Sequence, residues 1–307
     1  ITAVFTPTDT SNYNTGITAT MSIVVTKADT LTVTSVSENF TFTNSPAAVT
    51  ERFTLSGLAE IDSVTISSGS ITTNYMGTAN DSSTVNSTIA PTKAGDNYEI
   101  KPSSLVFASG LATNYVHVAY VSGVLSIARA ANNGNFNYSS SNQLTYSPTG
   151  IDTPTLTTFG EATPVYSGAN PEKCSINSST GALSIRQAGT CTVTMDVPEG
   201  YNYLSTSITK NVVINKAARS ITLSTVGTSL KYGDTASVTT TFTAGSEDGT
   251  LTYTSGFPTV CQYDDAGGEV LGIRGSGTCA IVAGITEGVN YLSATSNTLN
   301  FLAEKAD

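Results

Sequence analysis

Apolar and hydroxyl-bearing residues alternate with a period of two along most of this chain. In residues 31–34, 192–197 and 220–224, every second position is Leu, Val, Ile or Met, and the positions between them are Thr, Ser or Asp. This spacing is typical of β-strands that bury one face and leave the other in water. The β-branched side chain of Thr favours an extended backbone without adding charge. No ten-residue window combines helical periodicity with an N-cap, so the pattern predicts an all-β protein.

One type of segment recurs along the sequence. Residues 2–28, 191–217 and 279–306 each contain an alternating strand, a turn with the dipeptide Asn-Tyr, a second alternating strand and a closing Lys-Ala. Residues 114–130 end in the same way, with Arg in place of Lys. The closing alanines are 102, 87 and 89 residues apart, which is the length of a small β-sandwich. We therefore predict tandem repeats.

The closing alanines divide the chain into four predicted segments. Residues 1–29 supply only the last two strands of an incomplete β-sandwich, whereas residues 30–130, 131–217 and 218–307 each supply a complete one. The linkers between them are Lys-Ala or Arg-Ala dipeptides, and linkers this short restrict bending. The sequence thus predicts an elongated array of sandwiches.

The segment at residues 1–29 allows two interpretations, because a lone hairpin is marginally stable in water. The sequence is either an excerpt of a longer repeat protein, or the hairpin pairs with another chain through its unpaired strand edges. The sharper form of the second interpretation is a homopolymer assembled through residues 1–29 by strand exchange.

Four cysteines occur as two pairs at equivalent places in consecutive repeats. Cys174 and Cys191 are 17 residues apart, and Cys261 and Cys279 are 18 apart. We expect each pair to lie on neighbouring strands joined by a glycine-containing turn and to form a disulfide bond, since even counts at a repeated spacing favour disulfides in extracellular proteins. Free buried thiols and a metal site are the alternatives; zinc would need four ligands, and the one histidine, His117, belongs to a different repeat. Disulfides would imply an oxidising compartment.

Composition narrows the classes of function. The 307 residues include 38 Ser and 52 Thr but only 12% charged residues. A net charge of −10 would repel phosphates, which argues against nucleic-acid binding. No stretch approaches the roughly 18 apolar residues of a membrane-spanning helix. The expected partners therefore include no nucleic acid, and no membrane span is expected.

Few residues could carry catalysis or hold a cofactor. His117 lies in an alternating stretch without a nucleophile motif, which favours a solvent-facing residue over a general base. Asp264, Asp265 and Glu269, like the acidic residues 247–248, could offer oxygen ligands to calcium. Their spacing matches no calcium-binding loop, however, and acidic residues are common in turns. We expect no enzyme activity, no cofactor and no metal site.

Several stretches resemble bacterial repeat families. Residues 53–66, 95–100 and 114–130 (FTLSGLAEIDSVTI, GDNYEI and NYVHVAYVSGVLSIARA) look like the MBG repeat domain of large secreted and surface proteins. Residues 174–194 and 261–282 (CSINSSTGALSIRQAGTCTVT and CQYDDAGGEVLGIRGSGTCAIV) resemble bacterial immunoglobulin-like repeats of the Big type. Such families imply surface adhesins, stalks, and extracellular matrix or filament proteins.

The resemblance completes the expected fold class, which is all-β, with tandem immunoglobulin-like β-sandwich domains in an elongated array. One motif differs between repeats. Residues 231–234 of the third repeat read KYGD, whereas the first repeat has NFTF at residues 39–42, where this motif is expected.

Two functions follow from these observations. The first is a non-enzymatic extracellular structural module, a stalk, shaft or fibre-forming repeat segment of a bacterial surface adhesin or filament, whose partners are neighbouring repeats of the same chain. The alternative is a carbohydrate- or surface-binding adhesion module that recognises glycans or cell surfaces with loops at the domain ends. Its best candidate is the insertion at residues 74–94. We expect the tyrosines of the Asn-Tyr turns to pack over domain ends rather than to recognise sugar.

Overall fold

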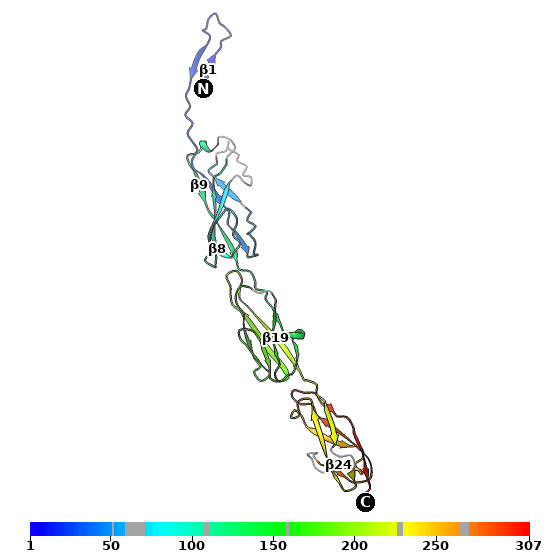
Figure 1. Cartoon of the computed structure of the whole chain (residues 1–307). Coiled ribbons are helices and arrows are strands. Elements are labelled where there is room, and N and C mark those ends of the chain that lie inside the picture. Colours follow the sequence, from blue (N-terminus) through cyan, green and yellow to red (C-terminus); the bar gives the residue numbers. More distant parts are fainter. Residues whose placement is uncertain (51, 59–70, 107–110, 158–159, 226–229, 264–269) are drawn as a thin grey trace. The chain divides into compact units, whose positions relative to one another are not determined.

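The computed structural model describes the chain except for residues 51, 59–70, 107–110, 158–159, 226–229 and 264–269. The chain forms two compact units, residues 1–130 with 201–203 and residues 131–200 with 204–307. Regular structure in the described part is almost entirely β-strand (Figure 1). The prediction of an all-β chain of tandem immunoglobulin-like β-sandwiches is confirmed. The elongated array and the four segment boundaries stay predictions.

The first unit contains a hairpin and a sandwich, here called the first sandwich. The hairpin consists of the antiparallel strands β1 (Thr2–Phe5) and β2 (Ile17–Thr20). One sheet of the sandwich has the strand order β4 (Glu38–Thr41), β10 (Gly123–Ala128), β8 (Gly95–Ser103), β6 (Thr72–Thr78) and β7 (Thr84–Ser87). The other sheet has the order β5 (Phe53–Ser56), β3 (Leu31–Ser35) and β9 (Val118–Val121), and the 3₁₀ segment η1 (Leu111–Asn114) precedes β9.

The second unit contains two further sandwiches. Three sheets make up the second sandwich: β12 (Gln143–Thr145), β19 (Thr206–Asn215), β18 (Gly189–Val197) and β15 (Val165–Gly168); β13 (Ile151–Asp152), β17 (Leu183–Ile185) and β16 (Cys174–Ile176); and β11 (Phe136–Asn137) with β14 (Thr155–Leu156). Two sheets make up the third: β20 (Ile221–Thr225), β22 (Thr235–Phe242), β25 (Val270–Ile273) and β24 (Cys261–Tyr263); and β21 (Leu230–Lys231), β28 (Leu299–Glu304), β26 (Gly277–Ile285) and β23 (Leu251–Ser255), with β27 (Ala294–Thr295) paired to β26.

Burial in the strands follows the alternation of the sequence. In β3, Leu31 and Val33 are fully buried, whereas the threonines between them are partly exposed. In β18, the residues from Cys191 to Val197 are buried at every second position. The sandwich cores are therefore formed by the inward faces of the strands, as the period of two predicts.

All three sandwiches share one strand arrangement that matters for the site. A short strand pairs in parallel with the last strand of the same sandwich: β4 with β10, β12 with β19, and β21 with β28. The residue after each short strand donates its backbone N–H to the last strand, with N···O distances of 2.8–2.9 Å; these residues are Phe42, Tyr146 and Tyr232. This place is therefore equivalent in the three sandwiches. It is also where the NFTF and KYGD motifs lie.

The segment α1 (Ser139–Asn142) is a turn rather than a regular helix, because Ser140 and Ser141 have φ angles of +48° and +56°. None of the helical segments in the described part of the chain is long and apolar enough to span a membrane.

Both cysteine pairs form disulfides, Cys174 with Cys191 and Cys261 with Cys279, with Cα–Cα distances of 6.0 and 5.7 Å. The expectation that each pair lies on neighbouring strands is wrong. Cys174 lies on β16 and Cys191 on β18, which belong to different sheets, because β17 takes up part of the intervening residues. Each disulfide thus joins two different sheets of its sandwich across the core.

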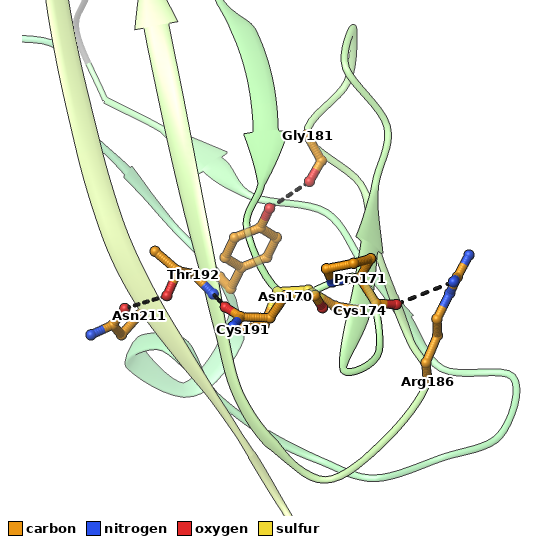
Figure 2. The surroundings of a disulfide bond; sticks show 9 residues. Asn170, Pro171, Cys174, Gly181, Arg186, Cys191, Thr192 and Asn211 are labelled. Atoms are coloured by element: carbon orange, nitrogen blue, oxygen red, sulfur yellow. Dashed lines mark hydrogen bonds between the residues drawn. A yellow bond between two sulfur atoms is a disulfide. The ribbon is translucent and has the colours of Figure 1, made fainter.

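Polar contacts surround the disulfide of the second sandwich (Figure 2). Asn170 Oδ1 accepts a hydrogen bond from the backbone N–H of Thr192 at 2.9 Å, and Pro171 O accepts one from Arg186 Nη1 at 3.1 Å. The loop before Cys174 is thereby attached to β18 and to the residue that follows β17.

Part of the insertion expected at residues 74–94 forms strands rather than a loop. Residues of this stretch form most of β6 and all of β7, which pair with each other and lie at one edge of the five-stranded sheet. The alternation of Val85 with its polar neighbours is a strand pattern that the comparison with shorter repeats obscured. Residues 79–83 and 88–94 are the parts of the stretch that lie outside strands.

We predict that each disulfide contributes about 3 kcal/mol to the free energy of unfolding of its sandwich, because it closes a loop of 17 or 18 residues in the unfolded chain. Urea unfolding with and without reductant should show this loss. The double variant Cys174→Ser/Cys191→Ser should lose the response in the second sandwich only. A count of four free thiols by mass spectrometry of the unreduced protein would contradict the prediction.

Candidate functional site: the Asn-Tyr joint

Three of the Asn-Tyr dipeptides form the same contact, which we call the Asn-Tyr joint. In each case the tyrosine forms an isolated parallel β-bridge with the alanine that closes the preceding repeat. The pairs are Ala28 with Tyr115, Ala130 with Tyr203, and Ala217 with Tyr291. The two motifs that recur most clearly in the sequence, Asn-Tyr and Lys-Ala or Arg-Ala, therefore meet in space.

Backbone hydrogen bonds hold the closing alanines. The N–H groups of Ala28, Ala130 and Ala217 donate to the carbonyl oxygens of Asn114, Asn202 and Asn290, with N···O distances of 2.8–2.9 Å. The carbonyl oxygen of Ala217 also accepts a hydrogen bond from the N–H of Leu292 at 2.9 Å. A linker bonded on both sides has less conformational freedom than its length alone implies.

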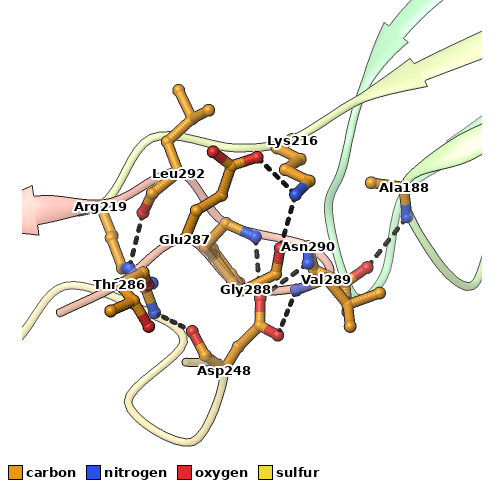
Figure 3. A network of polar contacts seen from close by, with 11 residues as sticks. Ala188, Lys216, Arg219, Asp248, Thr286, Glu287, Gly288, Val289, Asn290 and Leu292 are labelled. Atoms are coloured by element: carbon orange, nitrogen blue, oxygen red, sulfur yellow. Dashed lines mark hydrogen bonds and ion pairs between the residues drawn. The ribbon is translucent and has the colours of Figure 1, made fainter. Parts of the chain in front are cut away.

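The joint at Asn290-Tyr291 lies within the second unit and connects its two sandwiches (Figure 3). Asn290 Oδ1 accepts a hydrogen bond from the backbone N–H of Ala188 in the second sandwich at 2.9 Å. The ring of Tyr291 packs edge-on against Tyr146, with a centroid distance of 5.4 Å and an interplanar angle of 81°. Only 9% of Tyr291 is exposed, which agrees with the expectation that these tyrosines pack over domain ends.

The turn Asn202-Tyr203, which groups with the first unit, makes the same set of contacts. Asn202 Oδ1 accepts a hydrogen bond from the N–H of Ala94 at 2.8 Å. Tyr203 packs edge-on against Phe42, at 5.3 Å and 78°. Ala94 and Ala188 both precede the glycine that begins a long strand, and Phe42 and Tyr146 occupy equivalent places. The joint is thus a repeated structure with a fixed set of positions.

Arg219 anchors the turn of the third sandwich. Its guanidinium donates to the carbonyl oxygens of Leu292, Gly245, Asp248 and Thr286 at 2.5–2.9 Å, and 8% of the residue is exposed. Because a buried charge is costly without partners, these four bonds are what allow the arginine to lie here.

Asp248 holds the same turn from another loop. Its Oδ1 accepts the N–H of Val289 at 2.7 Å, and its Oδ2 accepts those of Asn290 and Tyr291 at 2.7 and 2.8 Å (Figure 3). Burial raises the pKa of Asp248. The three backbone hydrogen bonds and the charge of Arg219 together lower it by more than burial raises it, so the pKa lies below the usual 3.8. The ionised carboxylate therefore fixes the backbone of the Asn-Tyr turn.

An ion pair spans the joint. Lys216, which precedes the closing alanine, donates from Nζ to Glu287 Oε1 at 2.5 Å and to Gly288 O at 2.6 Å. Glu287 lies three residues before Asn290. The pair is partly exposed, so it contributes to alignment more than to stability.

Two glycines leave room for these contacts. A Cβ on Gly245 would overlap the ring of Tyr291, and a Cβ on Gly288 would overlap the carboxylate of Asp248. Gly245 also has a φ of +66°, which other residues rarely adopt.

The other candidate residues from the sequence do not meet in one site. His117 is exposed, and its carbonyl oxygen accepts the N–H of Leu31. Asp264, Asp265 and Glu269 lie outside the described residues. In the described part, no three acidic, histidine or cysteine side chains gather in a way that could hold a metal ion.

Sequence reasoning found the Asn-Tyr and Lys-Ala motifs but missed Arg219, Gly245 and the capping role of Asp248. Arg219 and Asp248 bond mainly to backbone atoms of segments 26 to 73 residues away. Backbone partners leave no mark on the residue types of those segments, so the sequence did not show which segments these side chains contact. The place of Arg219 two residues after Ala217 was a weak hint.

Comparisons with known proteins give similarity of fold alone. No family model matches the chain, and no curated protein matches it. Solved structures with a similar fold include domains EC1-2 of human protocadherin-24 (13% identity, 57% of this chain and 99% of that chain, TM-score 0.27) and EC1-4 of Drosophila N-cadherin (9%, 92% and 76%, 0.29). Domains 4 and 5 of the S-layer protein SbsC are a third example (15%, 58% and 100%, 0.26). At these identities and TM-scores the likeness indicates no ligand, activity or partner for this chain.

We predict that Asp248→Asn lowers the free energy of unfolding of the third sandwich by about 1–3 kcal/mol at neutral pH, because a charged acceptor of three backbone hydrogen bonds is lost. The folded-state pKa of Asp248 is depressed, so its contribution is present above pH 3.8 and is lost as the pH falls below that value. The difference between the wild type and the variant should therefore shrink in acid. Urea unfolding at a series of pH values measures it.

The matched control for Asp248→Asn is Glu247→Gln, which neutralises the preceding, exposed carboxylate. It should change stability little at any pH. A difference between wild type and Asp248→Asn that stays constant from neutral pH into acid would show that the charge of Asp248 does not hold the turn.

We also predict that Gly245→Ala destabilises the third sandwich more than Gly233→Ala does. Both glycines have a positive φ, but a Cβ on Gly233 would meet nothing within 4 Å. Gly233→Ala should cost only the backbone strain of about 1–2 kcal/mol, whereas Gly245→Ala should add about 1–3 kcal/mol by displacing Tyr291. Equal unfolding midpoints in urea would contradict a tight fit at the joint.

Proposed function

We propose that the chain is a non-enzymatic extracellular structural module, a stalk or fibre-forming repeat segment of a bacterial surface adhesin or filament. The observation that carries this proposal is the Asn-Tyr joint, which recurs at Ala28, Ala130 and Ala217. A module whose role is to set a distance needs defined connections between its repeats more than it needs a pocket. Repeated joints with the same hydrogen bonds supply such connections.

The disulfides support an extracellular location. Each bridge joins two different sheets of its sandwich and is buried in the core. Such bonds persist in oxidising environments and are rare in the cytosol of most organisms. They also suit a protein under mechanical load, because covalent links between sheets resist their separation.

The finer assignments belong to the same proposal. We assign residues 1–29 to the end of an incomplete repeat, residues 30–130 to an MBG-like sandwich, and residues 131–217 and 218–307 to Big-type immunoglobulin-like sandwiches. The solvent-facing sides of the strands are rich in Thr and Ser. They would give the protein a surface of low charge, consistent with 12% charged residues overall.

A carbohydrate- or surface-binding role is the alternative proposal. It places recognition in loops at the domain ends. The loops that carry Ala94 and Ala188, however, are engaged by Asn202 and Asn290. A cavity of about 280 Å³ beside Phe40, Pro46 and Ile127 has a largely apolar lining, which offers few groups for binding a sugar.

The proposed structural role predicts that one side chain at the joint affects the connection between sandwiches without affecting their cores. Asn290→Ala removes the acceptor of the Ala188 N–H, which should shift the equilibrium between docked and undocked joints by roughly two- to tenfold. Small-angle scattering of the dilute full chain should show a broader distribution of dimensions than in the wild type. Thermal unfolding of the cores should be nearly unchanged.

The matched control is Asn300→Ala, which removes the same side chain from an exposed position on β28. It should leave the scattering profile as it is. A wild-type profile typical of a compact globule, or an Asn290→Ala profile identical to the wild type, would contradict the structural role.

A further inference from the structure

We propose that the first sandwich binds a small uncharged aromatic molecule, of about the size of indole, in an apolar cavity beside its short strand β4. The cavity has a volume of about 280 Å³ and lies between β4, β10 and residues 43–48, which follow β4 and are here called the strap. This ligand site goes beyond the structural role and does not depend on it. Its basis is that the other two sandwiches fill the equivalent place with a side chain of their own.

The floor of the cavity is formed by Phe40 of β4 and Ile127 of β10. These two residues are partners in the parallel pairing of the strands, so their side chains lie next to each other on one face of the sheet. Ile127 is buried in the core of the first sandwich, and Phe40 is partly buried against it. The cavity therefore reaches from the surface to the core.

Backbone hydrogen bonds hold the strap over this floor. Just before the strap, Phe42 donates its N–H to the carbonyl oxygen of the last residue of β10 at 2.9 Å. Within the strap, Ala47 donates its N–H to Pro91 O at 3.0 Å, and after it Thr50 donates to Glu38 Oε2 at 3.3 Å. The cavity is thus formed without a ligand, and a preformed site avoids the cost of ordering its walls on binding.

In the second and third sandwiches, an isoleucine closes the loop that follows the short strand. Ile185 of β17 donates its N–H to Gly150 O, and Ile273 of β25 donates to Asp234 O, both at 2.9 Å. Both isoleucines belong to the buried cores. A Cβ on Gly150 would lie 3.0 Å from Ile185 Cδ1, so this side chain packs directly beneath the loop.

The first sandwich has no strand that corresponds to β17 or β25. These strands precede the long strands β18 and β26, whose counterpart in the first sandwich is β8. Residues 88–94, which connect β7 to β8, form no strand, and the strap is bonded to Pro91 instead of to an isoleucine. The cavity is therefore the space that the isoleucine side chain occupies in the other two sandwiches.

The lining determines which chemical class of ligand fits. Five lining residues are apolar and three carry hydroxyl groups: Phe40, Pro46, Ala47, Ala48 and Ile127, with Thr41, Thr43 and Ser45. None of the described lining residues is charged, so a charged ligand would lose its hydration without compensation. The hydroxyl-bearing residues are exposed and thus lie toward the opening, where one polar group of the ligand would meet them.

Size and ring chemistry narrow the class further. A cavity of about 150 Å³ holds benzene, so the larger volume in the first sandwich leaves room for a second ring. The ring of Phe40 favours an aromatic ligand, because pairs of aromatic rings attract each other beyond what the buried area gives. An uncharged compound of the indole or phenol type meets these requirements.

The test measures the binding of indole to the full chain. Because the chain has no Trp, the fluorescence of indole reports on the probe alone, and titration of the wild type should show saturable one-to-one binding. Ala47→Leu places a larger side chain at the cavity and should weaken binding about tenfold or more. Phe40→Leu introduces the residue that the second sandwich has at the equivalent position, Leu144, and should weaken binding about two- to tenfold by removing the ring.

The matched control is Ala128→Leu, which makes the same change as Ala47→Leu at an exposed position of β10, on the face opposite to Ile127. It should bind indole like the wild type. Indole should also raise the unfolding temperature of the wild type but not that of Ala47→Leu, since a ligand stabilises only the state that binds it. Circular dichroism checks that each variant is folded.

Three results would overturn the inference. They are the absence of saturable binding up to the solubility limit of indole, binding that folded Ala47→Leu and Phe40→Leu leave unchanged, and equal binding of cyclohexanol, which has no aromatic ring. Each of these results would leave the structural role intact, because Asn290→Ala tests that role at a different place in the chain.

Discussion

The hydrogen bond from the closing alanine of one repeat to the turn asparagine of the next is the constraint on which the rest of the structure depends. It occurs at Ala28, Ala130 and Ala217 with nearly the same N···O distance. A backbone N–H in a short linker would otherwise bond to water, and the linker would rotate freely. At Ala130 and Ala217, the asparagine side chain adds a second hydrogen bond and the tyrosine ring adds an aromatic contact.

The polar groups beneath the joint show how such a contact can be kept in place. Arg219 and Asp248 have opposite charges, yet the hydrogen bonds of each described above go to backbone atoms of the loops around the turn. Each charge thereby satisfies several backbone groups that burial would otherwise leave without partners. Because these bonds come from segments distant in sequence, the turn is rigid only when the third sandwich is folded. The disulfide of the third sandwich stabilises its folded state, because it links the two sheets covalently.

The sequence predicted much of the fold, and for identifiable reasons. The alternation in β3 and β18 fixes which residues are buried, since a strand presents successive side chains to opposite faces. The spacing of the cysteines predicted that Cys174 pairs with Cys191, but not that the bond crosses between sheets. The strand between the two cysteines, β17, is only three residues long, which is too short to show an alternating pattern. In the same way, residues 74–78 and 84–87 of the expected insertion form two paired strands within a sheet. Short strands carry too little periodicity to be located from one sequence.

By itself, the sequence determined the all-β class, the order of the repeats and the recurrence of Asn-Tyr and Lys-Ala, because these depend on residue type and local spacing. Only the tertiary structure decided that the two dipeptides meet, that Arg219 and Asp248 serve the turn, and that Tyr232 lies where Phe42 and Tyr146 lie. These relations are set by backbone pairing between distant strands. Backbone groups are the same in every residue, so the residue types of one segment do not show which distant strand it pairs with.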